Sequence, residues 1–327
     1  MEIVSRTRSV DALSGLLILW MIIYHAFQRV GMEHTIAFAV LLKVFFFFMP
    51  WFYFKSGLFF KPVGVVNRFA SDARKLLKPV IVWGGVGYIV SIALMDLGNV
   101  DLIHVLLWPF YFFLAMGDVR GNEPLWFLIS LFFVRTLGEI VARLNFSLQA
   151  FLLVALVLFG WYLSDIGMML PIGFQTLFIG LSFYMVASWF QMLKQFEGLR
   201  SYRHAVLCIA LFIFILACFV APSYLDVHRN DLWYGDYFAF YLFSLSGIYT
   251  FLKLFELYRF RILEWIGKKA IYFLVLHWPV FSIASYAWGL MPHSFGDLGQ
   301  LFYLIVVAVS VSIICAKYIS ENKMGLS

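Results

Sequence analysis

The chain has 327 residues, of which 63% are hydrophobic and only 13% are charged. Soluble domains carry about 25% charged residues, so this composition excludes a soluble globular enzyme, a disordered protein and a nucleic-acid-binding protein. It predicts an all-α, polytopic membrane helical bundle, because transmembrane helices satisfy their backbone polar groups within each segment. The excess of 24 Lys and Arg over 18 Asp and Glu residues is interpreted as a signal of membrane orientation, with no nucleic acid as partner.

Ten segments are long and apolar enough to cross a bilayer, and we expect them to form a single transmembrane domain over residues 1–327. A further apolar stretch, 102–116, is short and contains Pro109, so we expect an interfacial or re-entrant piece there. The ten predicted spans lie near residues 10–29, 35–60, 76–96, 125–143, 147–164, 169–191, 204–221, 234–254, 270–290 and 299–318.

The distribution of basic residues predicts the orientation of these spans. With ten spans and the N-terminus inside, nearly all Lys and Arg residues outside the second span fall on the inner side, and only Arg29, Arg120 and Arg229 fall outside. Basic residues are enriched on the cytoplasmic side of membrane proteins. We therefore expect both termini to lie inside.

The two longest outer loops combine carboxylates with aromatic residues. Segments 96–124 and 222–236 carry several Asp and Glu residues, and Trp233, Tyr234 and Tyr237 lie in or beside the second loop. Sugars offer hydroxyl groups to carboxylates and C–H faces to aromatic rings, so this composition suits a glycan ligand. The alternative is a pair of solvated loops beside an aromatic belt at the membrane surface.

The first span contains a stripe of polar residues in an apolar helix. Asp11, Ser14 and His25 fall on one face at helical spacing, and such residues in a span normally face the bundle interior or a cavity. His25 can act as a general base on a hydroxyl group, or it can form an interhelical hydrogen bond. Ser14 lies roughly 16 Å along the helix from His25, which excludes Ser14 as a nucleophile activated by this histidine.

The second predicted span contains two lysines and a proline. Lys43 is expected near the depth of His25, where it either binds an anionic group or oxyanion or pairs with an outer carboxylate. Lys55 is expected near the inner end, where its ammonium group can snorkel. Pro50 should interrupt the helix between them and free backbone groups that line a cavity.

Two further places combine polar side chains with a role in binding or packing. The inner loop 61–78 carries five basic residues, among which Arg74 and Lys75 are candidates to bind the phosphates of a cofactor; the alternative is the positive-inside rule alone. His277 precedes Pro279 in the ninth span, where it either bonds carbonyls that the proline frees or contacts a ligand. The three cysteines and the histidines show no metal-ligand spacing, so no metal site is predicted.

Four stretches follow one another along the chain: VDALSGLLILWMIIYHAF, FFFFMPWFYFKSGLFFK, EPLWFLISLFF and EWIGKKAIYFLVLHWP. Together they resemble motifs of acyltransferase family 3, the integral-membrane acyltransferases that include the fucose 4-O-acetylase-like group. VDALSGLLILWMIIYHAF is similar to the family's first span, which ends at a histidine, and FFFFMPWFYFKSGLFFK is similar to its second span. EPLWFLISLFF and EWIGKKAIYFLVLHWP resemble two later motifs in the expected order. One departure is clear: the family has an arginine at the position of Ser14, and Lys43, Arg8 or Lys55 are the residues that could replace it.

The resemblance implies a membrane-bound O-acyltransferase, an enzyme that transfers groups other than amino-acyl groups. Acetyl-CoA is the expected donor at the basic inner face, with Arg74, Lys75 and Lys55 as its ligands. The expected acceptor is a sugar hydroxyl of a cell-surface polysaccharide or lipid-linked glycan, with His25 as general base and with Lys43, Trp126 and His277 in substrate binding. Direct attack on the thioester and a covalent acyl-enzyme both remain open at this stage.

Two alternatives accompany this interpretation. The first is a transporter or flippase for a glycan or lipid precursor, in which the intramembrane Lys43, His25 and His277 bind substrate or protons. The second is a family member without activity, suggested by Ser14 at the arginine position.

Overall fold

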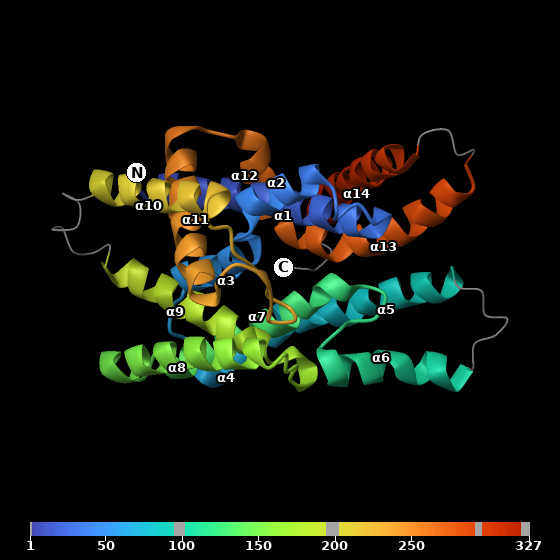
Figure 1. Cartoon of the computed structure of the whole chain (residues 1–327). Coiled ribbons are helices and arrows are strands. Elements are labelled where there is room, and N and C mark those ends of the chain that lie inside the picture. Colours follow the sequence, from blue (N-terminus) through green and yellow to red (C-terminus); the bar gives the residue numbers. More distant parts are fainter. Residues whose placement is uncertain (1, 95–101, 194–202, 292–295, 322–327) are drawn as a thin grey trace.

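The computed structural model describes residues 2–94, 102–193, 203–291 and 296–321. It is almost entirely helical, as Figure 1 shows. The helices are α1 (Glu2–Val30), α2 (Ile36–Phe45), α3 (Phe48–Leu58), α4 (Val65–Asp72), α5 (Lys78–Ala93), α6 (Leu102–Met116), α7 (Trp126–Val141), α8 (Phe146–Asp165), α9 (Thr176–Leu193), α10 (Arg203–Phe219), α11 (Tyr237–Leu257), α12 (Arg261–Lys268), α13 (Ala270–Gly289) and α14 (Gly296–Glu321). Shorter elements are the π-helical turn η1 (Ala73–Leu77), the 3-10 turns η3 (Glu123–Leu125) and η4 (Pro171–Gly173), and strands β1 (Tyr224–Asp226) and β2 (Asp231–Tyr234).

Within the described residues, 9 helical segments are long and apolar enough to cross a membrane. This confirms the predicted all-α polytopic membrane protein. Each of these segments corresponds to one of the ten predicted spans. The remaining prediction, 204–221, matches α10, which has 17 described residues and begins where a stretch outside the description ends. The stretch 102–116 forms α6, whose 15 residues are fewer than a membrane span needs.

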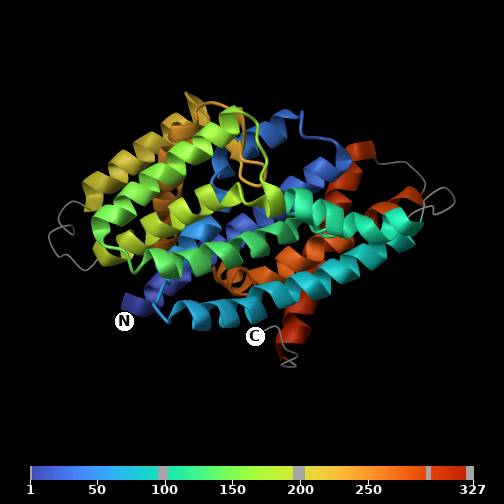
Figure 2. The same cartoon turned by 90° about the horizontal axis from the view of Figure 1, so that it is seen from below.

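The predicted interruption of the second span is present. Helices α2 and α3 are separated at Phe46–Phe47, about one turn before Pro50. Because proline has no N–H group, it cannot bond the carbonyl four residues earlier, which is that of Phe46. The third predicted span continues at its N-terminal end through η1 into α4, so that α4, η1 and α5 form one long helix along an edge of the molecule (Figure 2).

Helix α1 lies at the centre of the bundle. It contacts α3, α11, α12, α13 and α14 (Figure 1), and its side chains Leu13, Leu17 and Ile22 are fully buried. A helix that is buried on all sides is apolar on almost every face, and this central position therefore explains the composition of α1. The polar stripe of α1 is therefore inside protein rather than in lipid.

Glycines bring α1 and α12 into backbone contact. A Cβ atom added at Gly267 would lie 1.8 Å from the carbonyl oxygen of Asp11, and one added at Gly15 would lie 2.1 Å from that of Leu263. Helices in membranes associate through such small residues because they allow close approach. The Ile-Gly-Lys sequence at the end of α12 is thus explained by packing against the first helix.

The contact at Gly267 predicts a strong effect of a single methyl group. We expect Gly267→Ala to destabilise the protein by about 1–3 kcal/mol, the usual cost of overpacking, because the nearest atoms belong to the backbone and have little room to move. Gly85→Ala is the control, since nothing lies within 4 Å of a Cβ atom at that exposed helical glycine. Thermal unfolding midpoints in detergent measure both, and equal midpoints for the two variants would contradict the role of this contact.

Candidate active site

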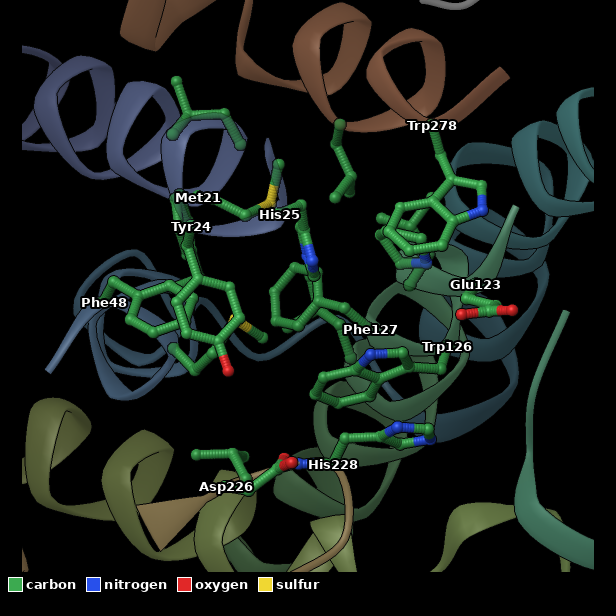
Figure 3. A pocket seen from close by; sticks show the side chains of 18 of the residues that line it. Met21, Tyr24, His25, Phe48, Glu123, Trp126, Phe127, Asp226, His228 and Trp278 are labelled. Atoms are coloured by element: carbon green, nitrogen blue, oxygen red, sulfur yellow. The ribbon is translucent and has the colours of Figure 1, made fainter. Parts of the chain in front are cut away.

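A cavity of about 470 Å³ lies between α1, α3, α7, α13 and the β1–β2 hairpin. Figure 3 shows labelled side chains from α1, α3, α7, α13 and the hairpin around one space, with His25 among them. The end of the cavity beside the β1–β2 hairpin, called the hairpin end, is polar. It includes Glu33, Asp118, Glu123, Asp226, His228 and Arg229. The far end of the cavity is apolar and includes Ile18, Phe52, Leu76, Ala270 and Ile271.

The His25 imidazole is held by a neighbour on the same helix. Its Nδ1 atom lies 2.9 Å from Oε1 of Gln28, three residues later on α1. An amide oxygen only accepts hydrogen bonds, so Nδ1 carries the hydrogen and Nε2 carries a free lone pair. The rings of Tyr24 and Trp278 approach the imidazole edge to face, at centroid distances of 5.3 Å each. The arrangement leaves a basic nitrogen on a positioned ring at the cavity wall.

His277 lies behind His25 rather than in the cavity wall. The two imidazole rings stack with centroids 5.4 Å apart, and His277 is 0% exposed. Its Nδ1 donates to the carbonyl oxygen of Phe273 at 2.9 Å. The carbonyl that Pro279 frees is that of Val275, and the Nδ2 atom of Asn122 donates to it at 2.8 Å. Asn122, not His277, therefore compensates for this proline.

The hairpin end of the cavity is built around a stacked histidine. The His228 ring lies over Trp126, with centroids 4.5 Å apart and planes 12° apart. Its Nε2 atom lies 3.2 Å from Oδ1 of Asp118. The backbone amides of His228 and Arg229 donate to Oδ1 of Asp226, which fixes the turn between the strands. Two loops that are more than 100 residues apart in sequence thus meet above His25.

The ionisation of this cluster follows from its burial. Burial raises the pKa of the Asp118 carboxyl to about 6, and the nearby Glu123 carboxylate adds to the increase. Burial lowers the pKa of His228 to about 4. At neutral pH, His228 is therefore a neutral donor or acceptor, and the carboxylates dominate the charge of the hairpin end.

A second polar cluster lies one helical turn beyond the far end of the cavity. The Nζ atom of Lys55 donates to Oγ of Ser14 at 2.8 Å and lies 4.0 Å from Oδ1 of Asp11. Nε1 of Trp51 donates to the same hydroxyl oxygen at 3.2 Å, and Ser14 is 0% exposed. Of the three residues considered as replacements for the family arginine, Lys55 is the one whose charge reaches the Ser14 side chain.

Arg74 and Lys75 lie on η1, immediately before the cavity residue Leu76. Both side chains are exposed, and the residue before η1, Asp72, forms an ion pair with Arg135 of α7. Arg135 donates to both carboxylate oxygens of Asp72, at 2.7 and 3.1 Å. A wider turn of this kind often occurs at functional sites. The predicted phosphate ligands are thus solvent-accessible and one residue away from the far end of the cavity.

Glu139 anchors the chain that leads into α4. Its Oε1 atom accepts from the backbone amides of Val63 and Gly64, at 2.9 and 2.7 Å, and its Oε2 atom accepts from Nε of Arg68 at 3.3 Å. The loop that carries the basic residues is therefore tied to α7, the same helix that supplies Trp126.

Lys43 stands apart from the other predicted site residues. It lies on α2, its carbonyl oxygen accepts a hydrogen bond from Sγ of Cys218 on α10, and it is not among the described residues that line the cavity. Of the residues predicted for substrate binding, the structure brings only Trp126 into the cavity with His25.

Gln28, Asp118 and His228 complete the site and were not singled out from the sequence. The His25–Gln28 spacing of three residues was a visible signal, whereas the pairing of Asp118 with His228 depends on the fold.

A family model described as an acyltransferase domain matches residues 7–317. Because the match covers nearly the whole chain, the chain belongs to acyltransferase family 3 and is a membrane enzyme that transfers acyl groups. Searches among curated proteins and solved structures return no match.

The raised pKa of Asp118 predicts a pH-dependent difference in stability. Between about pH 4 and pH 6, the folded protein retains a proton that the unfolded chain releases, so this group's contribution to stability falls as the pH rises. We expect Asp118→Asn to lose that contribution, and its thermal midpoint relative to wild type should therefore be higher at pH 7.5 than at pH 4.5. His228, whose pKa is lowered, has the opposite dependence but is present in both proteins. A midpoint difference that does not change with pH would refute the assignment.

Proposed function

We propose that the protein is an O-acetyltransferase that moves an acetyl group from acetyl-CoA to a sugar hydroxyl of a cell-surface polysaccharide or lipid-linked glycan. The observation that carries this proposal is the free Nε2 atom of His25 in the cavity between two chemically different ends. We place the protein in a bacterial inner membrane, with both termini and the basic residues of η1 on the cytoplasmic side.

In the proposed reaction, His25 is the general base. Nε2 takes the proton from the acceptor hydroxyl while the hydroxyl oxygen forms a bond to the thioester carbonyl carbon. The carbon–sulfur bond then breaks, and the imidazolium returns the proton to the CoA thiolate, giving the O-acetyl ester and free CoA. No serine, threonine or cysteine is among the described residues that line the cavity, which favours direct transfer over an acyl-enzyme on one of these side chains.

The donor is proposed to approach the cavity from its far end. Arg74 and Lys75 are exposed cations beside that end, and phosphates are bound well by such groups. The apolar residues Leu76 and Ile271 suit the uncharged arm that links the CoA nucleotide to its sulfur atom. Lys55 lies one turn below, where its ammonium group can interact with a polar group of that arm.

The acceptor is proposed to bind at the hairpin end. Trp126, Trp233 and Trp278 line the cavity and offer faces for the C–H groups of a sugar ring. The described charged residues at this end comprise four carboxylates, on Glu33, Asp118, Glu123 and Asp226, against the guanidinium of Arg229. This excess of negative charge favours an uncharged sugar over one that carries a carboxylate or phosphate.

Replacement of the proposed base tests the chemistry directly. We expect His25→Ala to lower acetyl transfer at least 100-fold, because general base catalysis contributes about 10²–10⁴ in rate. His34→Ala is the matched control, since His34 is exposed in the loop that follows α1. Labelled acetyl-CoA, a glycan extract and membranes that contain equal amounts of each protein provide the assay. Transfer at the wild-type rate by His25→Ala would remove His25 from this role.

Removal of the exposed cations on η1 tests the donor site. We expect the double variant Arg74→Ala and Lys75→Ala to raise the KM for acetyl-CoA about tenfold or more with little change in kcat, because charge-assisted hydrogen bonds are worth about 1.5–3 kcal/mol. The control is Arg143→Ala, which removes an exposed cation at the end of α7. An unchanged KM in the double variant would place the CoA phosphates elsewhere.

A further inference from the structure

A chain of hydrogen bonds joins His25 to the outer hairpin. Beyond the bond from Nδ1 of His25 to Gln28, the Nε2 atom of Gln28 donates to the Tyr24 hydroxyl at 3.3 Å. The hydroxyl of Tyr224, on β1, donates to the same Tyr24 oxygen at 3.3 Å. Tyr24 and Tyr224 are both buried, and 200 residues separate them in sequence. The chain therefore connects the first helix with a strand that the fold brings to it.

The direction of these bonds has a consequence for Tyr24. Its oxygen accepts from Gln28 and from Tyr224, so its own hydrogen must point away from both of them. Tyr24 lines the cavity, and Figure 3 shows its hydroxyl turned toward the side where Asp226 lies. The Tyr24 hydroxyl is thus left as a hydrogen-bond donor facing the space above His25.

The hairpin is held rigidly enough to position a side chain. The amides of His228 and Arg229 bond to Asp226 in the turn, and Nε2 of Gln175 donates to the carbonyl oxygen of His228 at 2.8 Å. The Tyr224 ring packs edge to face on Trp233 with centroids 5.1 Å apart. Tyr224 and Asp226 are two residues apart on β1, so the strand that contributes Asp226 to the cavity also contacts Tyr24.

We propose that Tyr224 is a positioning residue that acts on His25 through Tyr24 and Gln28. By occupying one acceptor site on the Tyr24 oxygen, the Tyr224 hydroxyl keeps Tyr24 and the Gln28 amide in place, and Gln28 then keeps the hydrogen of His25 on Nδ1. The hairpin that forms the acceptor end of the cavity thereby also sets the tautomer of the base. This inference rests on the proposed function for its kinetic consequences and on the hydrogen-bond geometry for its effect on His25.

Tyr224→Phe is the central variant, because it removes one hydroxyl group and leaves the packed ring. The matched control is Tyr234→Phe, which alters the β2 residue paired with Tyr224 in the same hairpin. Two measurements are made on the full-length protein in detergent. The first is the rate at which diethyl pyrocarbonate modifies His25, followed by peptide mass spectrometry, with the exposed His34 as internal reference. The second is the split between kcat and the KM for acetyl-CoA.

In Tyr224→Phe we expect His25 to be modified at least threefold more slowly, since most of the population then places its hydrogen on Nε2. We expect kcat to fall by a similar factor while the KM for acetyl-CoA is unchanged. Gln28→Leu should show the same effects more strongly. Gln28→Glu should keep most of the wild-type modification rate that Gln28→Leu loses, because a carboxylate oxygen also accepts from Nδ1.

The outcomes separate this proposal from the proposed function. Equal modification rates at His25 in Tyr224→Phe and Tyr234→Phe would overturn the positioning role, as would a change confined to the KM for acetyl-CoA. The two proposals can also fail separately. If Tyr224→Phe slows the modification of His25 but the wild-type protein transfers no acetyl group, the hydrogen-bond chain is supported and the acetyltransferase is refuted. Thermal midpoints of the variants identify any loss of folding. Tyr24→Phe removes the hydroxyl that links Tyr224 to Gln28, so it supplies the same test without a change in the hairpin. A His25 modification rate in Tyr24→Phe equal to that in Tyr234→Phe would overturn the proposal.

Discussion

Polar side chains on α1 must find partners within the protein, and this constraint organises the rest of the structure. In a bilayer no water is available to satisfy them, so the helix is buried at the centre of the bundle and each polar group meets a specific neighbour. Ser14 receives hydrogen bonds from Lys55 and Trp51 of α3. His25 bonds to Gln28, and the backbone at Asp11 contacts Gly267. The cavity exists along the one part of this stripe that neighbouring helices leave open.

Hydropathy and local sequence chemistry predicted the helices well, because span length and proline positions depend on nearest neighbours and on bilayer thickness. They also singled out His25, whose side chain lines the cavity. They did not indicate which of Lys43 and Lys55 contacts Ser14, since both are lysines in one apolar span. Only the packing of α3 against α1 brings Lys55 to Ser14. The role of His277 was equally undetermined, because the carbonyl freed by Pro279 is satisfied by Asn122, a residue 153 positions away.

The hairpin end of the cavity shows what composition can and cannot predict. Acidic and aromatic residues in two loops indicated a ligand-binding surface, and the structure does bring Asp118, Trp126 and His228 together. Which carboxylate meets which ring depends on long-range contacts that leave no local pattern. The raised pKa of Asp118 has the same origin, because it follows from burial by residues of the distant hairpin.

The wide turn η1 has a consequence for how the chain length of this region can vary. A π-helical turn accommodates one residue more than the α-helix around it, and loss of that residue would rotate α4 by roughly 100° relative to α5. Asp72 would then leave Arg135, and the cationic side chains before Leu76 would turn to another face. Insertions and deletions between α4 and α5 are therefore constrained by angular phase and not by span length, so a homologue that differs in length here should compensate within the same turn.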